Sequence, residues 1–495
     1  MTAPFISLLA IYIAMGTIIA LVSRRFGVKS SADYFVAGYR LGGFLASMTY
    51  AATTYSAFMM VGLVGLAFAT GIAALGFELA YLIATMGILA TVGPTIWRLA
   101  RERGWVSPSE MVSDLYNSQI LGMAIPVLYL VALIPYVAAQ LKGVGEIFDV
   151  VGLGYGVGIA VALGLVLLWT LIAGVWSVAT TDAYQGIWML GASISVTLWL
   201  STALIPSSNL DVSRIVEVLR TTASGNLLSN TWPINVFIGF TTPWLFFALT
   251  NPQVVQRLYM PKNSRAYRGM VRYFALYGLL YTALVVLIGL VFRAYVASTL
   301  GREVEIYLVK HRDMVTPYML SLASPLLAVF TFVSIVAAAI STANSIILSV
   351  ASSITRDLYE RRAKIVRQQT TRLIAWISIA VMSMAAAIIA FAKPAFIVEL
   401  SVLSSALLLP LAPVTLAGLY LQPRSKGSAS TLPALLSIAS GFIIMLLTAI
   451  VYGAKKALIA TWLSIPIPLW VLIVSTLIVV LGVLILRPEI SGNTS

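Results

Sequence analysis

Thirteen long apolar runs constrain this sequence more than any other feature. The hydrocarbon core of a bilayer is about 30 Å thick, and a helix of about 20 apolar residues crosses it. Because lipid offers no hydrogen-bond partners, such a segment must satisfy its own backbone groups, as a helix does. We therefore predict an all-α polytopic membrane protein with about thirteen transmembrane helices. The runs lie at 4–22, 43–70, 74–97, 119–141, 154–175, 178–205, 231–250, 270–296, 318–355, 371–392, 395–421, 431–453 and 464–486.

Composition agrees with a membrane bundle and excludes several chemistries. Charged residues make up 10% of the chain, against roughly 25% in soluble proteins. With no cysteine and a single histidine, His311, the chain cannot form disulfides, thiol-based active sites or multi-histidine metal sites. No catalytic pair is evident, so we expect a non-enzyme. The run 4–22 lacks a basic start and a small-residue cleavage motif, which predicts a retained transmembrane helix rather than a signal peptide.

The basic excess is explained by membrane topology. The 31 lysines and arginines outnumber the 17 aspartates and glutamates, giving a net charge of +14. If the N-terminus lies outside, about two thirds of the basic residues fall in the predicted inner loops, as the positive-inside rule requires. We therefore predict an N-out/C-in multi-pass protein of the plasma membrane. A nucleic-acid partner is unnecessary, and no obligate protein partner is evident.

Two of the predicted helices contain residues that interrupt a helix. The run 43–70 carries a polar cluster at 49–56, and the run 231–250 carries Gly239, Thr241, Thr242 and Pro243. These runs are five spans apart, and an odd separation would place a duplicated unit in the membrane in the opposite sense. Paired interrupted helices point to an inverted-repeat transporter with a site near the midplane. The predicted units are a leading helix at 4–22, repeats at 43–205 and 231–421, and two trailing helices at 431–486.

A row of hydroxyls marks one face of the run 318–355. Ser341, Ser345, Ser349 and Ser352 recur every three to four residues, so they share a helix face that should look into protein or a watery path. Helix packing through small residues is the alternative explanation. The interrupted helix at 49–56 favours a cation site, because its carbonyls complement the hydroxyls, and oxygen ligands without a carboxylate suit a monovalent ion. The predicted ligands are the carbonyls of Ala52, Tyr55 and Ala338 and the hydroxyls of Ser341 and Thr342. Ser345, Ser349 and Ser352 are expected to line or pack.

Other polar residues have either a functional or a solvated interpretation. Asp182 lies close to the start of an apolar helix, where a carboxylate is costly unless it is paired, hydrated or protonated. It could instead cap that helix at the water interface. The segment from Asn251 to Arg265 is expected to be a solvated loop. The charged segment from Arg356 to Arg362 is expected to mark where its helix leaves the membrane.

Four segments in order resemble the sodium/solute symporter family, whose members have the LeuT-type inverted-repeat fold. The first is Asp33-Tyr34-Phe35-Val36-Ala37-Gly38 followed by Leu41-Gly42-Gly43. The second runs from Gly174 through Thr181-Asp182 to Gln185-Gly186. The third is Asn251-Pro252-Gln253 through Gln256-Arg257 to Lys262-Asn263-Ser264. The fourth runs from Ala338 through Ser341-Thr342 to Thr355-Arg356-Asp357-Leu358-Tyr359.

The resemblance implies a sodium-coupled symporter that imports a small organic solute by alternating access, with Na⁺ as the co-transported ion. It places sodium on the five ligands named above and a second cation at Thr181 and Asp182. Segments near Met48 and Lys262 resemble pantothenate-type members and indicate a carboxylate substrate, although Asn344 replaces an aspartate of those relatives. Alternatives are proton coupling through Asp182 and, lower in rank, a transporter-like sensory module. The predicted substrate contacts are Ser56, Phe58, Glu78, Gln140, Trp244 and Ser401.

Overall fold

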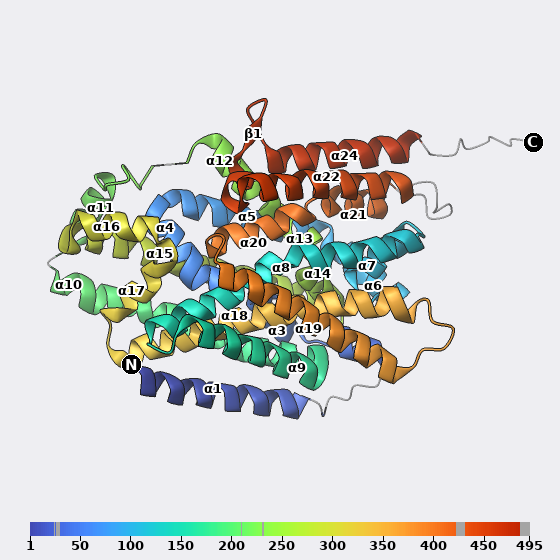
Figure 1. Ribbon diagram of the computed structural model, residues 1–495, viewed down its shortest axis with the longest axis horizontal. Helices are drawn as coiled ribbons and strands as arrows, with labels where there is room; N and C mark the ends of the chain where they lie inside the picture. Colours follow the sequence, from blue (N-terminus) through green and yellow to red (C-terminus); the bar gives the residue numbers. More distant parts are fainter. Residues whose placement is uncertain (24, 26–29, 209, 230–231, 422–430, 486–495) are drawn as a thin grey trace, which may run out of the picture.

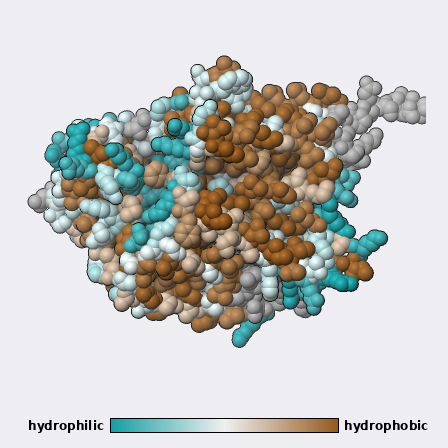
Figure 2. Space-filling model, in the orientation of Figure 1, coloured by the Kyte–Doolittle hydropathy of each residue, from teal (hydrophilic) through white to brown (hydrophobic). Residues whose placement is uncertain are grey.

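In the computed structural model, the chain forms a bundle of helices that run along the long axis of the molecule (Figure 1). The structure describes residues 1–23, 25, 30–208, 210–229, 232–421 and 431–485. Apolar side chains cover the middle of the visible face, and hydrophilic side chains gather towards both ends (Figure 2). This distribution fits a bilayer crossing between the two ends, so the chain is a multi-pass membrane protein.

Each of the thirteen predicted runs contains a helix or a bent pair of helices. Nine helices of the described residues are long and apolar enough to cross a membrane, or up to eleven if each of two bent pairs is one span. Two shorter apolar helices, Tyr155–Thr170 and Ile467–Gly482, occupy the remaining runs. The number of crossings and the N-out/C-in orientation stay predictions. Residue 486 and five basic residues used for the orientation lie outside the described residues: Arg24, Lys29, Arg424, Lys426 and Arg487.

The first half of the chain contains the leading helix and the helices of the predicted first repeat. Its α-helices are α1 (Thr2–Ser23), α2 (Ser31–Val36), α3 (Gly43–Thr54), α4 (Val64–Thr70), α5 (Ile72–Thr91), α6 (Gly93–Arg103), α7 (Pro108–Leu115), α8 (Gln119–Val150), α9 (Tyr155–Trp199), α10 (Ile205–Ser207) and α11 (Val212–Arg220). Short 3₁₀ or π-helical turns are η2 (Ala37–Tyr39), η3 (Phe58–Leu63) and η4 (Leu200–Leu204).

The second half contains the predicted second repeat, followed by the trailing helices. Its α-helices are α12 (Ile234–Leu245), α13 (Phe247–Thr250), α14 (Pro252–Tyr259), α15 (Ser264–Tyr295), α16 (Arg302–Lys310), α17 (Val315–Ser321), α18 (Pro325–Ser353), α19 (Gln368–Ala392), α20 (Ile397–Leu408), α21 (Leu411–Tyr420), α22 (Thr431–Tyr452), α23 (Ala454–Ile459) and α24 (Ile467–Ile485). The other elements are η5 (Val296–Leu300), η6 (Arg312–Met314), η7 (Ile354–Glu360) and an antiparallel hairpin of β1 (Thr461–Trp462) and β2 (Ile465–Pro466).

Helix α18 forms the centre of the bundle. Every residue from Thr331 to Ser353 is buried, as expected of a helix that is surrounded by protein on all sides. It packs against α9, α8, α1, α19 and α3. The predicted hydroxyl face therefore looks into the protein interior rather than into lipid.

The first predicted helix interruption is present. Helix α3 ends at Thr54, Tyr55 adopts an extended backbone (φ −90°, ψ 106°), and the chain resumes in η3 and α4 at an angle of 50° to α3. The polar cluster at 49–56 therefore borders a break, where backbone groups are released from the helix.

The prediction of an interrupted helix at residues 239–243 is wrong about the position of the break. Helix α12 continues through Gly239 and Pro243, and the break comes at Phe246, before the short helix α13. The hydroxyls of Thr241 and Thr242 donate to the carbonyls of Phe237 and Ile238, at 2.6 and 2.7 Å. Because these bonds stay within one helical turn, the polar residues are accommodated without a break.

A glycine sets the junction between the fifth and sixth predicted spans, which are joined within α9. Gly174 has φ 60° and ψ −151°, a region that side chains with a Cβ rarely adopt. A Cβ at this position would also lie 2.5 Å from the carbonyl oxygen of Tyr34. Both constraints explain why glycine occupies the bend that precedes Thr181 and Asp182.

Candidate cation and solute site

Four of the five predicted sodium ligands converge between α3 and α18. The Ser341 hydroxyl lies 2.9 Å from the carbonyl oxygens of both Ala52 and Ala338. The Thr342 hydroxyl lies 3.1 Å from the Ala52 carbonyl and 3.3 Å from that of Thr53. All five residues are buried. We call these three carbonyls and two hydroxyls the oxygen cluster.

The break in α3 makes these carbonyls available. The last helical hydrogen bond of α3 runs from Tyr55 N to Ala51 O, and a helix end leaves its final carbonyls without partners. In a continuous helix the N–H of Ala57 would donate to Thr53, but here it donates to Gln140 Oε1 at 3.3 Å. Among the hydrogen bonds of the described residues, Ser341 and Thr342 are joined to Ala52, Ala338 and Thr53 and not to Tyr55. The Tyr55 carbonyl as a sodium ligand stays a prediction.

The oxygen cluster suits a small monovalent cation. Two hydroxyl protons face three carbonyl oxygens, so oxygen acceptors outnumber donors. No group of three or more histidine, aspartate or glutamate side chains that could hold a metal occurs in the described parts of the chain. Hard cations prefer oxygen, and divalent ions prefer several carboxylates.

Asp182 lies beside the oxygen cluster in a chain of buried polar contacts. Thr49 donates to Asp182 Oδ2 at 2.6 Å, and the Arg257 guanidinium lies 3.8 Å from the same oxygen. Arg257 also donates to Ser345 at 2.6 Å, and Thr53 donates to Ser345 at 2.9 Å. Asp182 is thus part of an interior ion pair and not a cap at a water interface.

The carboxylate of Asp182, predicted as a ligand of a second cation, lies 3.8 Å from the Arg257 guanidinium. The Thr181 hydroxyl donates to the Ser177 carbonyl at 2.9 Å, within its own helix. A second cation at Asp182 remains a prediction, and Arg257 already supplies a positive charge there.

The prediction of a solvated loop from Asn251 to Arg265 is wrong for its first part. Helix α14 is buried along its whole length, and Arg257 is 0% exposed. The residues that satisfy it come from distant segments: Gln256 donates to the carbonyl of Val106 and to Ser352, both at 3.0 Å. The polar side chains of Gln256 and Arg257 therefore make hydrogen bonds inside the protein rather than with water.

Four of the predicted substrate contacts lie near one another. Trp244 lies 5.6 Å from Phe58 between ring centroids. Gln140 binds the backbone beside Ser56 and Phe58, and the Ser56 hydroxyl accepts from the Phe58 N–H at 3.1 Å. More rings surround Trp244, and we call this set the aromatic cage: Phe58, Phe77, Tyr81, Tyr136, Trp244 and Phe247.

The remaining two predicted contacts differ in their surroundings. Glu78 is buried and lies in α5 between the cage residues Phe77 and Tyr81. Ser401 is also buried, but its hydroxyl donates to the Ile397 carbonyl at 2.9 Å within α20. Among the described residues, no ring contact or hydrogen bond joins Ser401 to the cage, so its substrate contact stays a prediction.

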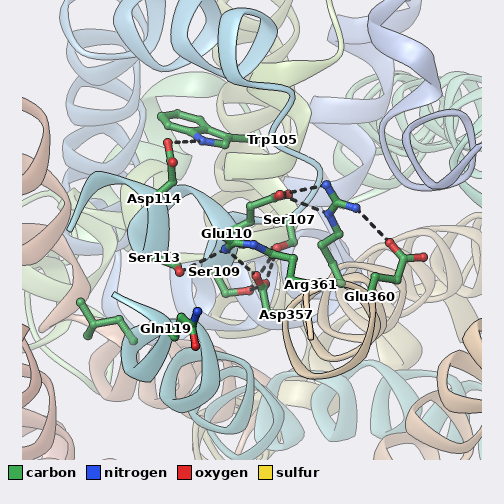
Figure 3. A network of polar contacts seen from close by, with 12 residues as sticks. Trp105, Ser107, Ser109, Glu110, Ser113, Asp114, Gln119, Asp357, Glu360 and Arg361 are labelled. Carbon is green, nitrogen blue, oxygen red and sulfur yellow. Dashed lines mark hydrogen bonds and ion pairs between the residues drawn. The ribbon is translucent and has the colours of Figure 1, made fainter. Parts of the chain in front are cut away.

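A network of ion pairs ties α7 to η7 near the end of the bundle that lies at the right of Figure 1 (Figure 3). Asp357 accepts from Ser107 at 2.7 Å and from Ser109 at 2.5 Å. Arg356 pairs with Glu110 at 3.1 Å. Asp357 is buried against α7, and Glu360 accepts from Ser31 of α2 at 2.6 Å. That the segment from Arg356 to Arg362 marks a helix leaving the membrane stays a prediction.

We expect Asp357→Asn to loosen this end of the bundle, because the amide loses the charge that two serines and Arg361 bind. The chain has no cysteine, so a Val106→Cys reporter beside the network is unique. Its alkylation rate should rise several-fold in the Asp357→Asn background. Glu217→Gln, which breaks the exposed pair with Arg214, is the control. Equal rates in both backgrounds would contradict the role of Asp357.

The bent helix α3, the oxygen cluster and the neighbouring aromatic cage lie inside a polytopic membrane bundle. The model of the sodium:solute symporter family matches residues 34–429. The chain therefore belongs to the sodium:solute symporter family, as the resemblance of its four segments predicted. This is a family of transporters, which agrees with the expectation of a non-enzyme.

Curated relatives are distant in sequence. The chain is 23% identical over 400 residues to the sodium/proline symporter of Staphylococcus aureus (strain JH9), covering 78% of this chain and 74% of that one. It is 23% identical over 336 residues to a monocarboxylate transport permease protein of Rhizobium johnstonii, covering 66% and 64%. It is 28% identical over 146 residues to the uncharacterized symporter YodF of Bacillus subtilis, which is 29% of each chain. The chain thus spans less than two thirds of two of these relatives.

Solved structures show the fold. A Na⁺-coupled sialic acid symporter in a substrate-bound outward-open state has a TM-score of 0.73 at 16% identity, over 97% of this chain and 96% of that one. The nucleobase-cation-symport-1 family transporter Mhp1, in a closed conformation, has a TM-score of 0.53 at 14% identity, over 90% and 96%. The predicted LeuT-type fold is confirmed by these likenesses.

Proposed function

We propose that this protein is a sodium-coupled symporter that imports a small organic solute across the plasma membrane by alternating access. The observation that carries the proposal is the oxygen cluster, where carbonyls released by the break in α3 meet Ser341 and Thr342 of α18. Family membership and the sodium-coupled relatives support sodium as the ion. Because α3 and α18 both contribute oxygens, a bound cation would hold the two helices together beside the cage.

The membrane potential can supply the driving force for such uptake. One charge that moves through 100 mV releases about 2.3 kcal/mol, which is a concentration ratio of several tens-fold. The proposal specifies the substrate only as a small organic solute. A carboxylate such as pantothenate stays a prediction, and its charge would need a basic group or the co-bound cation at the site.

The test is uptake into proteoliposomes with ion gradients imposed one at a time. We expect an inward sodium gradient at equal pH to drive accumulation of a labelled solute chosen from proline, pantothenate, short carboxylates and sugars. A pH gradient without sodium should drive none. Uptake that follows the pH gradient and ignores sodium would establish the proton-coupled alternative instead.

A further inference from the structure

Glu78 differs from every other buried carboxylate in the described residues. Its side chain is 1% exposed, and its Oε2 has no hydrogen-bond partner. The other buried carboxylates all lie in ion pairs with lysine or arginine: Glu110, Glu146, Asp182, Glu305, Asp313, Asp357, Glu360 and Glu399. A buried carboxylate without a basic partner is costly in a membrane protein, which makes Glu78 a candidate contact for a ligand.

Glu78 lies in α5 next to Phe77 and three residues before Tyr81, and both of these rings belong to the aromatic cage. Phe77 stacks on Trp244 with centroids 6.2 Å apart and planes 12° apart, and Tyr81 lies 5.7 Å from Trp244. The carboxylate is also within electrostatic range of the phenol groups of Tyr55, Tyr81 and Tyr136. Trp244 Nε1 has no hydrogen-bond partner in the described structure. The negative faces of such rings attract a cation, and tryptophan attracts it most strongly.

Each buried lysine or arginine of the described residues pairs with a carboxylate other than Glu78. Lys142 pairs with Asp313 at 2.5 Å and Arg293 with Glu305 at 2.7 Å. Arg312 pairs with Glu399, and Arg257 faces Asp182. In the described residues no lysine or arginine pairs with Glu78 or lies over the Trp244 ring. A ligand that carries a positive charge would therefore give Glu78 the partner that the described residues do not supply.

We propose that the transported solute carries a positively charged ammonium group, which lies against the aromatic cage and pairs with Glu78. The inference rests on the proposed transport function and names the chemical class of its substrate. A neutral hydroxyl compound could donate a hydrogen bond to Glu78 but would leave the carboxylate charge uncompensated among apolar rings. An anion would add a second negative charge beside it. Both a cationic solute and a zwitterionic solute can supply the ammonium group that would pair with Glu78.

Pairs of isosteric probes test the inference by calorimetry on the purified full-length protein in sodium chloride. Choline is compared with 3,3-dimethyl-1-butanol, and glycine betaine with 3,3-dimethylbutanoate, because each second compound replaces the ammonium nitrogen by carbon. L-Proline adds a secondary ammonium. We expect at least one ammonium probe to bind, with its carbon isostere roughly thirty-fold weaker, the loss of a desolvated cation–π contact of about 2 kcal/mol.

Matched variants assign the effect to this site. Glu78→Gln keeps the side-chain size and should remove most of the discrimination between the isosteres, whereas Glu102→Gln, at an exposed position in α6, should leave it unchanged. Trp244→Phe should retain more of the discrimination than Trp244→Leu. The inference is overturned if a carbon isostere binds as tightly as its ammonium partner, if Glu78→Gln keeps the full discrimination, or if no ammonium probe binds.

A second measurement distinguishes failure of the ammonium proposal from failure of the proposed sodium-coupled transport. It is the shift in the midpoint of thermal unfolding that sodium causes in the absence of solute. If sodium stabilises the wild-type protein and Ser341→Ala abolishes that effect, a negative result with the ammonium probes overturns the substrate class alone. If sodium has no effect on the wild-type protein, the proposed coupling to sodium fails as well.

Discussion

Replacing Ser341 and Thr342 together by alanine is expected to abolish sodium-stimulated uptake while the protein still reaches the membrane. Each hydroxyl lies against carbonyls of the broken helix, and both are buried. Loss of a buried polar ligand costs about 1–3 kcal/mol, so two losses should raise the half-saturating sodium concentration roughly a hundredfold or more. The measurement is initial uptake into proteoliposomes over a range of external sodium concentrations.

Ser349→Ala provides a matched control for this double variant. Ser349 is buried two turns further along α18, and its hydroxyl has no hydrogen-bond partner in the described structure. Its loss should leave the sodium dependence within about twofold of the wild type, because it removes no ligand. Equal sodium dependence in the double variant and in Ser349→Ala would refute the assignment of the oxygen cluster.

The sequence was sufficient to predict the helices and the half of the site that depends on local chemistry. Membrane helices follow from apolar length, because lipid leaves the backbone no alternative. The polar cluster at 49–56 indicated the break in α3, since polar residues there gain nothing inside a continuous apolar helix. The hydroxyl row of α18 then predicted Ser341 and Thr342 as its partners, and the structure places them against Ala52.

Features that depend on distant partners could not be predicted. Gln256 and Arg257 look like loop residues in the sequence, yet they are buried because Val106, Ser345 and Ser352 accept their hydrogen bonds. Thr241 and Thr242 indicated a break, but their hydroxyls bind carbonyls of their own helix. Likewise, only the positions of the described lysines and arginines show that none of them pairs with Glu78.

Breaking the buried pair of Asp182 and Arg257 is expected to destabilise the protein by about 3–5 kcal/mol, because one charge is then left unpaired in the interior. Both side chains are at most 1% exposed, and they lie 3.8 Å apart. Asp182→Asn and Arg257→Gln should each lower the midpoint of thermal unfolding and reduce uptake, since Ser345 and Thr53 connect the pair to the oxygen cluster.

The double variant Asp182→Asn/Arg257→Gln decides whether the two residues act as a pair. It removes both charges, so its loss of stability should be smaller than the sum of the single losses by more than about 0.5 kcal/mol. The same cycle on Arg214 and Glu217, a pair that is 58% and 65% exposed, should show a coupling of no more than about 0.5 kcal/mol. Additive losses at Asp182 and Arg257 would mean that the carboxylate is stabilised chiefly by Thr49, and the guanidinium would then not act as the cation of this site.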